Sequence, residues 1–315
     1  MRFQLTSRTQ NPLSAILTPP LLSYCTEITF PWPLSTPLSG TEVAFAFFGQ
    51  DTTLKWSVPE VKIALLELSR LGLPNISVSD LVSILGDPTK ELQTFLHRSV
   101  AIILLLDQGP RHLCKGVDAR YTYDYFGVLA RNLVSHFFSL PPTQNPYNLT
   151  TWTSTGIELS HGFLRISMLL APLCHSDIAR DHSLHLQLES SVRQYYEIQT
   201  NTIDPYRQTF TEDTNDIYLA ANMLEEGPLH LKGSMDKAVS MRIEQFVYWM
   251  MRYFTAHVAY VEWFGRSPFR NCAVGRRDRE GEKEWLDYCG IVVDEGVRER
   301  VRRDIEGGGW RPLEL

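Results

Sequence analysis

The stretch FVYWMMRYFTAHVAYVEWF, residues 246–264, sets the fold class. Its large side chains recur at intervals of four and three residues, at Phe246, Met250, Tyr253, His257, Tyr260 and Phe264. This spacing is typical of one face of an α-helix, and we expect that face to be buried. Gly265 follows the stretch and Pro268 comes three residues later, as at the end of a helix. We therefore predict a long buried helix that starts near Met235 to Ala238 and ends at Phe264.

Working outward, helical spacing extends over most of the chain. It predicts two helices, before and after Asp107, that form a hairpin around Gly109-Pro110. Further helices are predicted over residues 57–71, 77–86, 157–171 and 176–199, and loops over 141–153 and 203–215. Alternation with a period of two residues, which would indicate strands, is nowhere sustained. The predicted fold class is therefore all-α.

The pattern divides the chain into three regions. Residues 1–41 hold six of the 18 prolines and show no helical spacing, so we expect an irregular, proline-rich N-terminal arm. Residues 42–290 are expected to form the helical domain, and residues 291–315 a charged C-terminal helix and tail. Arginines and acidic residues alternate between Arg276 and Glu306, which favours a solvated helical face.

Composition and charge restrict the function classes. A net charge of −6 over 315 residues repels a polyanion, so no nucleic-acid partner is expected. No apolar run approaches the roughly 20 residues of a membrane span, and prolines interrupt the N-terminal region, so no membrane partner and no signal peptide are expected. Five cysteines without a CxxC spacing indicate reduced thiols and a cytoplasmic location. No cofactor is predicted.

Three segments concentrate polar residues at predicted helix ends, and the first is LDQGPR, residues 106–111. A charged group at the end of a strongly apolar helix requires a partner. Arg111 therefore either pairs structurally with Asp107 or holds an anionic ligand through its planar guanidinium. On the second interpretation Asp107, Gln108 and Arg111 are candidate ligand-binding residues.

The second segment is PLCHSD, residues 172–177, which leads into a helix. His175 stands in the turn before that helix, and its ordinary pKa suits proton transfer near neutral pH. His175 is therefore the leading candidate for a catalytic acid or base, and Asp177 is expected to orient it. On the structural interpretation Ser176 caps the helix and Asp177 favours its positive end.

Histidines also occur on the helix that follows. His182, His185 and Glu189 share one face with His175, because their offsets fall within about 80° of arc. His182 and His185, with Asp177 or Glu189 completing the set, could bind zinc or iron. The usual zinc helix has two histidines four residues apart beside a glutamate, and that arrangement is absent, so no metal is assigned.

The third segment is FGRSPFRN, residues 264–271, followed by Gly275-Arg276. Its polar side chains suit a carboxylate or phosphate, and the candidates are Arg266, Arg270, Asn271 and Arg276. Alternatively, these arginines cap helix ends and connect neighbouring helices. His257, two turns earlier on the apolar face, is a further catalytic candidate, although a histidine there is also typical of a core.

Taken in this order, the segments resemble the family known as domain of unknown function 924, over roughly residues 43–288. Its FWFG-like opening is matched by FAFFG at 45–49, and its LLDQFPRN segment by LLDQGPRH at 105–112. Its PLEHSE and FGRFPHRN segments are matched by PLCHSD and FGRSPFRN. The resemblance implies a tetratricopeptide-like fold of antiparallel helical hairpins in one compact domain. It implies no reaction.

The chain also departs from the family pattern. Cys174 stands in place of a glutamate, Gly109 and Ser267 in place of aromatic residues, Phe269 in place of a histidine, and His182 in place of a glutamine. These changes remove a carboxylate and a histidine from the motif segments. They indicate either a different ligand or the loss of an ancestral activity.

We expect the three segments to converge on one cavity lined by aromatic side chains and by Arg111, Arg266 and Arg270. Its ligand would be a small anionic organic molecule. An enzyme of this kind would use His175 for hydrolysis, isomerisation or cyclisation in a specialised biosynthetic pathway. The alternative is a non-catalytic helical-repeat module that offers a groove to a protein partner.

Overall fold

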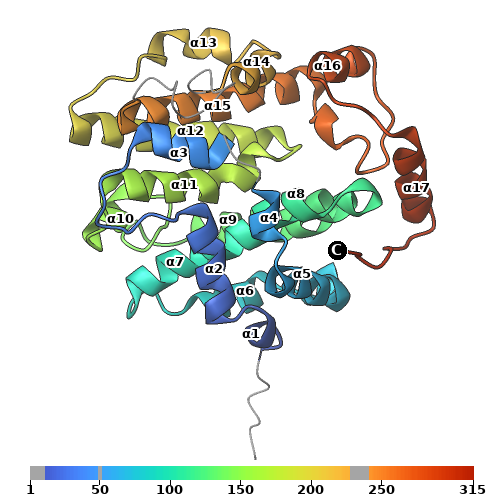
Figure 1. The fold of residues 1–315 in the computed structure, drawn as a ribbon, viewed down its shortest axis with the longest axis horizontal. Coiled ribbons are helices and arrows are strands. Elements are labelled where there is room, and N and C mark those ends of the chain that lie inside the picture. The colour runs from blue at the N-terminus through green and yellow to red at the C-terminus, as the bar shows by residue number, and fades with distance from the viewer. Residues whose placement is uncertain (1–10, 49–51, 228–240) are drawn as a thin grey trace, which may run out of the picture.

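The computed structural model describes residues 11–48, 52–227 and 241–315. All regular structure in these ranges is helical, so the predicted all-α fold class is confirmed (Figure 1). The repeated hairpin arrangement that the family resemblance implies stays a prediction. None of the helices in the described ranges combines the length and the apolar character of a segment that crosses a bilayer.

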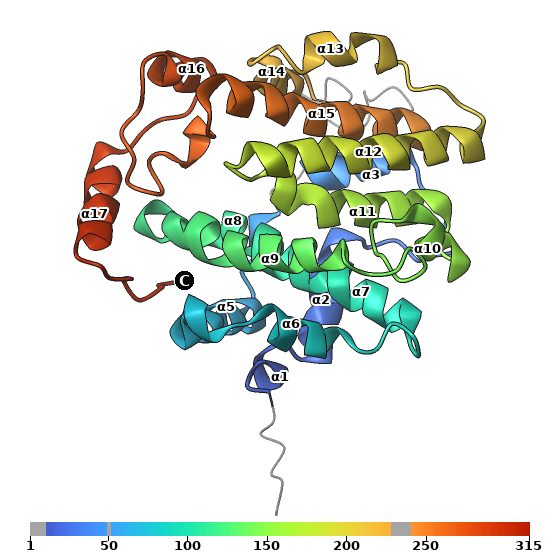
Figure 2. The ribbon, with the colours of Figure 1, turned by 180° about the vertical axis from the view of Figure 1, so that it is seen from behind.

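Three long helices lie side by side in the upper half of the molecule as drawn (Figures 1 and 2). They are α11 (Leu159–Cys174), α12 (Ala179–Thr200) and α15 (Ile243–Phe264). Helix α15 ends at Phe264 as predicted, because Gly265 adopts the left-handed conformation with φ 70°. Helix α15 begins only at Ile243, after an extended Arg242, so the start predicted near residues 235–238, which lie outside the described residues, is too early.

The predicted hairpin at Gly109-Pro110 is wrong. Helix α7 (Leu92–Ile103) continues through a π-helical turn, Leu104–Gln108, into α8 (Gly109–Leu113). Proline has no N–H for the carbonyl four residues earlier, and the widened π turn accommodates this loss without reversing the chain. The reversal comes after Leu113, and a second π turn, Tyr121–Phe126, then leads into α9 (Gly127–Phe137).

The N-terminal region is helical over much of its length, so the expectation of an irregular arm is wrong for residues 13–29. Helices α1 (Leu13–Ile16) and α2 (Pro19–Thr29) occupy it, and α3 (Gly40–Phe48) begins inside it. The two prolines that argued against a helix stand in the first turn of α2, where a missing N–H costs nothing. Residues 1–10 of the expected arm lie outside the described part of the chain.

Shorter helices complete the fold. The predicted helices over 57–71 and 77–86 are present as α5 (Pro59–Leu71) and α6 (Val78–Leu85). The two predicted loops contain α10 (Leu149–Ser154) and α13 (Phe210–Asp213). The remaining α-helices are α4 (Thr53–Trp56), α14 (Leu219–Glu226), α16 (Glu282–Tyr288) and α17 (Glu295–Glu306).

The charged C-terminal region packs against the rest of the chain. On α17, Arg298 and Val301 are buried, so this helix is not the fully solvated face that its charge pattern favours. The tail after α17 lies on the second π turn. There the Trp310 ring centroid is 4.7 Å from that of Tyr121, and the Arg120 guanidinium lies 4.0 Å above the Trp310 ring.

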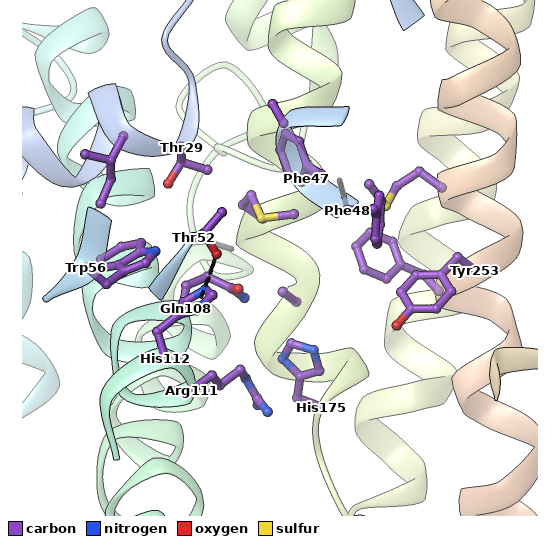
Figure 3. Close-up of a pocket in the computed structure, with 16 residues that line it drawn as sticks. Thr29, Phe47, Phe48, Thr52, Trp56, Gln108, Arg111, His112, His175 and Tyr253 are labelled. Carbon is purple, nitrogen blue, oxygen red and sulfur yellow. Dashed lines mark hydrogen bonds between the residues drawn. The ribbon is translucent and has the colours of Figure 1, made fainter. Parts of the chain in front are cut away.

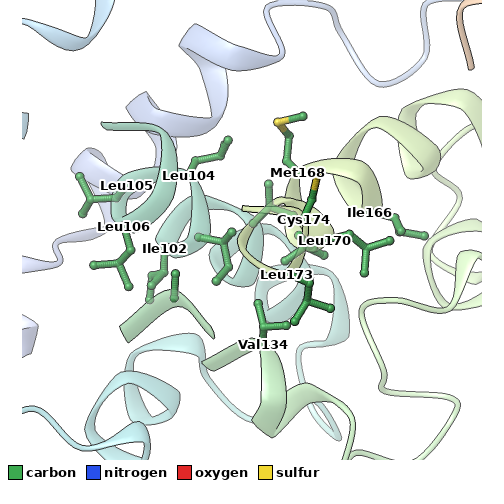
Figure 4. Close-up of a cluster of buried hydrophobic side chains, with 14 of the residues drawn as sticks. Ile102, Leu104, Leu105, Leu106, Val134, Ile166, Met168, Leu170, Leu173 and Cys174 are labelled. Atoms are coloured by element: carbon green, nitrogen blue, oxygen red, sulfur yellow. The ribbon is translucent and has the colours of Figure 1, made fainter. Parts of the chain in front are cut away.

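An apolar core holds two of the polar segments in place (Figure 4). Leucines of the first π turn pack in one buried cluster with residues of α9 and α11, among them Leu104, Leu106, Val134, Leu170 and Leu173. Asp107 directly follows the leucines of the first π turn, and His175 directly follows the last residue of α11. Packing of the core therefore fixes the backbone on which both polar residues stand.

Candidate functional site

A cavity of about 210 Å³ lies among α2, α3, α4, α8, α11 and α15 (Figure 3). Most of its wall is apolar, formed by Ile28, Ala46, Phe47, Phe48, Trp56, Met168, Ala171, Met250 and Phe254. Its polar lining consists of Thr29, Thr52, Gln108, Arg111, His112, His175 and Tyr253. Helix α2 contributes two of these residues, so the N-terminal region that was expected to be irregular forms part of the wall.

The polar end of the cavity is organised by Asp107, whose side chain is 2% exposed. His175 Nδ1 lies 3.0 Å from Asp107 Oδ2, and Gln108 Nε2 donates to the same oxygen at 2.7 Å. Arg111 donates from Nη2 to Asp107 Oδ1 at 3.2 Å. One buried carboxylate therefore positions a histidine, an amide and a guanidinium from three different residues.

This geometry determines the proton positions. Burial raises the pKa of Asp107, but the charge of Arg111 and the hydrogen bonds from His175 and Arg111 outweigh it and hold that pKa below its ordinary value. The ionised carboxylate only accepts hydrogen bonds, so His175 Nδ1 carries the proton and Nε2 keeps its lone pair. Burial, reinforced by the charge of Arg111, also lowers the pKa of His175, which favours the neutral ring. His175 is therefore arranged as a base.

Asp177 does not orient His175, contrary to the sequence-based expectation. Its carboxylate accepts the Ser267 N–H at 2.8 Å and Arg276 Nη1 at 2.7 Å. Arg270 Nη1 lies 3.3 Å from the same carboxylate, and the guanidinium of Arg270 also stands over the Tyr123 ring at 4.9 Å. Asp177 thus ties the third segment to the start of α12.

The third segment does not line the cavity. Arg266 donates to both oxygens of Glu282 at 2.7 Å, and Asn271 donates to Glu282 at 2.9 Å and to Asp278 at 2.9 Å. Of the three arginines that we expected in one cavity, only Arg111 is there. Arg266 is paired with Glu282 and Arg270 with Asp177. Residue composition does not reveal such pairings.

His257 lies beneath the cavity wall and is not part of the lining. Its Nδ1 is 2.8 Å from the carbonyl oxygen of Tyr253, to which it donates, and its ring centroid is 6.3 Å from that of His175. Burial lowers the pKa of His257 to about 3, so it stays neutral at ordinary pH. Its position is that of the core histidine that the apolar face indicated.

The histidines of α12 have protein partners. His182 Nε2 lies 2.9 Å from the carbonyl oxygen of Ser176, and His185 Nε2 lies 3.2 Å from Glu189. Glu189 is also paired with Arg193 and accepts a hydrogen bond from Thr255. Among the residues that the structure describes, no group of three or more histidine, cysteine, aspartate or glutamate side chains is placed to hold a metal ion.

Sequence reasoning missed several residues of the cavity, namely Phe47, Phe48, Trp56, His112 and Tyr253. The aromatic pair on α3 stands in the FAFFG stretch, whose likeness to the family opening was the available signal. Tyr253 belongs to the apolar face of α15 and therefore looked like a core residue. Trp56 carries no local signal, and it lies against Gly109, where an added Cβ would approach its ring to 3.4 Å.

Comparisons with known proteins agree with the motif resemblance. No curated protein and no solved structure matches the chain. The family model described as "Bacterial protein of unknown function (DUF924)" matches residues 81–290, which include all three polar segments but not α3 or Trp56. This match covers most of the 315 residues. The chain therefore belongs to that family of unknown function, domain of unknown function 924.

Proposed function

We propose that the chain binds a small organic molecule with one anionic group in this cavity, and that His175 acts on it as a general base. The observation that carries the proposal is the single carboxylate of Asp107, which holds His175 and Arg111 together at the polar end of an apolar cavity. Pockets that are mostly apolar with a few converging polar groups are typical of small-molecule sites.

The size of the cavity limits the ligand. An apolar protein cavity of about 150 Å³ accommodates benzene. The 210 Å³ cavity is somewhat larger, and aromatic side chains from α3, α4 and α15 line it. It therefore suits a molecule with a single ring and a small polar substituent.

The charge at the cavity limits the ligand further. Among the described residues that line the cavity, Arg111 is the only arginine, and Asp107 uses two of its five N–H groups. The side chain is 24% exposed, and we expect its remaining donors to be open to a carboxylate. One guanidinium recognises one carboxylate, so we expect a ligand with a single negative charge.

The chemistry follows from His175. Its Nε2 lone pair can take a proton from the ligand or from a water molecule, and ionised Asp107 then stabilises the imidazolium. Hydrolysis, isomerisation and cyclisation all use such a base, and a specialised biosynthetic pathway is the expected setting. All five cysteines are free thiols, which supports a reducing, cytoplasmic location.

Calorimetric titration with benzoate tests the proposal. We expect the wild-type protein to bind benzoate and to bind benzyl alcohol more weakly, because the alcohol lacks the charge. Arg111→Met should weaken benzoate binding by about tenfold or more, since a hydrogen bond to a charged group contributes roughly 1.5–3 kcal/mol. Arg70→Met, on the exposed surface of α5, is the matched control and should leave binding unchanged.

Two outcomes would contradict the proposal: no benzoate binding by the wild-type protein, or equal binding by the folded Arg111→Met variant. The first would favour the non-catalytic interaction module. The second would show that the cavity does not use Arg111 to select charge.

A further inference from the structure

The Tyr253 hydroxyl faces the same cavity as His175 (Figure 3). Its ring is fixed from several sides. It stacks on Trp249 with the centroids 5.4 Å apart, and it meets the edges of Phe48 at 5.9 Å and His257 at 4.7 Å. These contacts leave the hydroxyl little freedom to turn away from the cavity.

The hydroxyl has no hydrogen-bond partner among the described residues, although the ring around it is closely packed. Burial raises the pKa of Tyr253, so the group stays protonated and is available as a donor. A partly buried donor without a protein partner is costly unless a ligand or water satisfies it. Tyr253 therefore presents one hydrogen-bond donor to whatever occupies the cavity.

His175 presents the complementary group nearby. The ring centroids of His175 and Tyr253 both lie within 6.3 Å of the His257 ring. His175 offers a lone pair on Nε2, since Asp107 holds its Nδ1 proton. A base and a neutral donor from two different elements thus face one mostly apolar space, beside the guanidinium of Arg111.

We infer that Tyr253 recognises a carbonyl oxygen of the substrate, and that the substrate is a ring ketone with one carboxylate. This inference rests on the proposed function and deepens it. His175 Nε2 takes a proton from the carbon next to the carbonyl, and the electron pair of that C–H bond forms a carbon–carbon double bond. The carbonyl π pair moves onto the oxygen, where the Tyr253 hydroxyl stabilises the negative charge.

The same steps describe a complete reaction without a co-reactant. In an unsaturated ketone, return of the proton from His175 to the remote carbon of the extended enolate shifts the double bond. No atom or electron is gained or lost, so the product is an isomer. Within the classes left open by the proposed function, this arrangement favours isomerisation.

The first test uses p-nitrophenol as a probe. Its phenolate oxygen mimics the enolate oxygen of the substrate, and its absorbance reports whether the phenol is ionised. We expect the wild-type protein to bind the phenolate form. Tyr253→Phe keeps the ring contacts and should weaken this binding by about tenfold or more. Tyr288→Phe, at an exposed position on α16, is the control and should have no effect.

The second test follows proton exchange directly. With 3-oxocyclohexanecarboxylate in deuterated water, nuclear magnetic resonance should show faster exchange of the protons next to the carbonyl in the presence of the wild-type protein. His175→Asn should abolish this acceleration, and Tyr253→Phe should reduce it by about tenfold or more.

The two proposals fail in different ways. If benzoate binds but p-nitrophenol does not, or if Tyr253→Phe changes neither probe binding nor exchange, the assignment of Tyr253 is overturned and the proposed function stands. If the wild-type protein binds neither benzoate nor p-nitrophenol, both are overturned. Absence of exchange above the buffer rate overturns the ring-ketone assignment.

Discussion

Asp107 connects the two polar segments that form the site. The residue types of the site could be predicted locally, because His175 and Arg111 stand at the ends of apolar helices. The pairing could not, since Asp107 and His175 are 68 residues apart and Asp177 is the nearer carboxylate in sequence. Burial of Asp107 makes its three hydrogen-bond partners depend on one another.

Replacing Asp107 tests this dependence. Asp107→Asn leaves the Arg111 charge without its partner and no longer fixes the proton on His175 Nδ1. We expect the free energy of unfolding to fall by about 3–5 kcal/mol, as for other broken buried pairs. Proton exchange of 3-oxocyclohexanecarboxylate should slow by at least tenfold, whereas benzoate binding should persist because Arg111 remains.

Chemical denaturation, the exchange rate and calorimetry measure these three effects separately. Asp287→Asn, at an exposed position on α16, is the control. An Asp107→Asn variant with wild-type exchange would mean that Asp107 does not set the protonation of His175.

At the scale of elements, the third segment supports the fold and lies outside the cavity. Glu282, fully buried at the start of α16, accepts hydrogen bonds from Arg266, Asn271 and the Arg279 N–H. Sequence reasoning allowed this structural role, in which the arginines connect neighbouring helices, as one of two interpretations. It could not choose between them, because an arginine cluster shows only that partners are required and does not identify them.

Glu282→Gln should therefore reduce stability without affecting the ligand. The amide cannot neutralise Arg266, so the melting temperature should fall by several degrees, consistent with a loss of about 3–5 kcal/mol. Benzoate affinity in the folded variant should equal that of the wild type. Glu284→Gln, exposed on the same helix, should change neither quantity; a large loss of affinity in Glu282→Gln would show that the third segment does contribute to binding.

The helices themselves differed in how well local sequence predicted them. The end of α15 was predicted to the residue, because a glycine in the left-handed conformation is a local signal. The Gly109-Pro110 hairpin was wrong because a proline that usually breaks a helix is tolerated here by a π turn held in the core. Likewise Pro19 and Pro20 initiate α2, since the buried face that follows them stabilises a helix.

At the scale of the whole molecule, buried and half-buried histidines link stability to pH. Burial lowers the pKa of His97 and of His182 to about 4, and that of His257 to about 3, from an ordinary value of 6.5. The unfolded chain therefore binds protons in a range where the folded protein does not. The stabilisation by these groups is complete above pH 6.5 and is lost progressively as the pH falls towards 4 and below.

We expect the free energy of unfolding to decrease between pH 6.5 and pH 4, as measured by denaturant titration at several pH values. His182→Gln should flatten this decrease, because one proton-binding group is removed from the unfolded chain. His136→Gln, at a half-buried position in the last turn of α9, serves as the control. A pH-independent stability over this range would contradict the burial of these rings.

The packing of the tail has a consequence for biosynthesis. Tyr121 donates to the carbonyl oxygen of Arg311, 190 residues further along the chain, and its ring lies against Trp310. During translation the aromatic side chains at the second π turn stay exposed until Trp310 has emerged from the ribosome. Exposed apolar surface of this kind promotes aggregation, so we expect the nascent chain to depend on chaperones that hold emerging polypeptides.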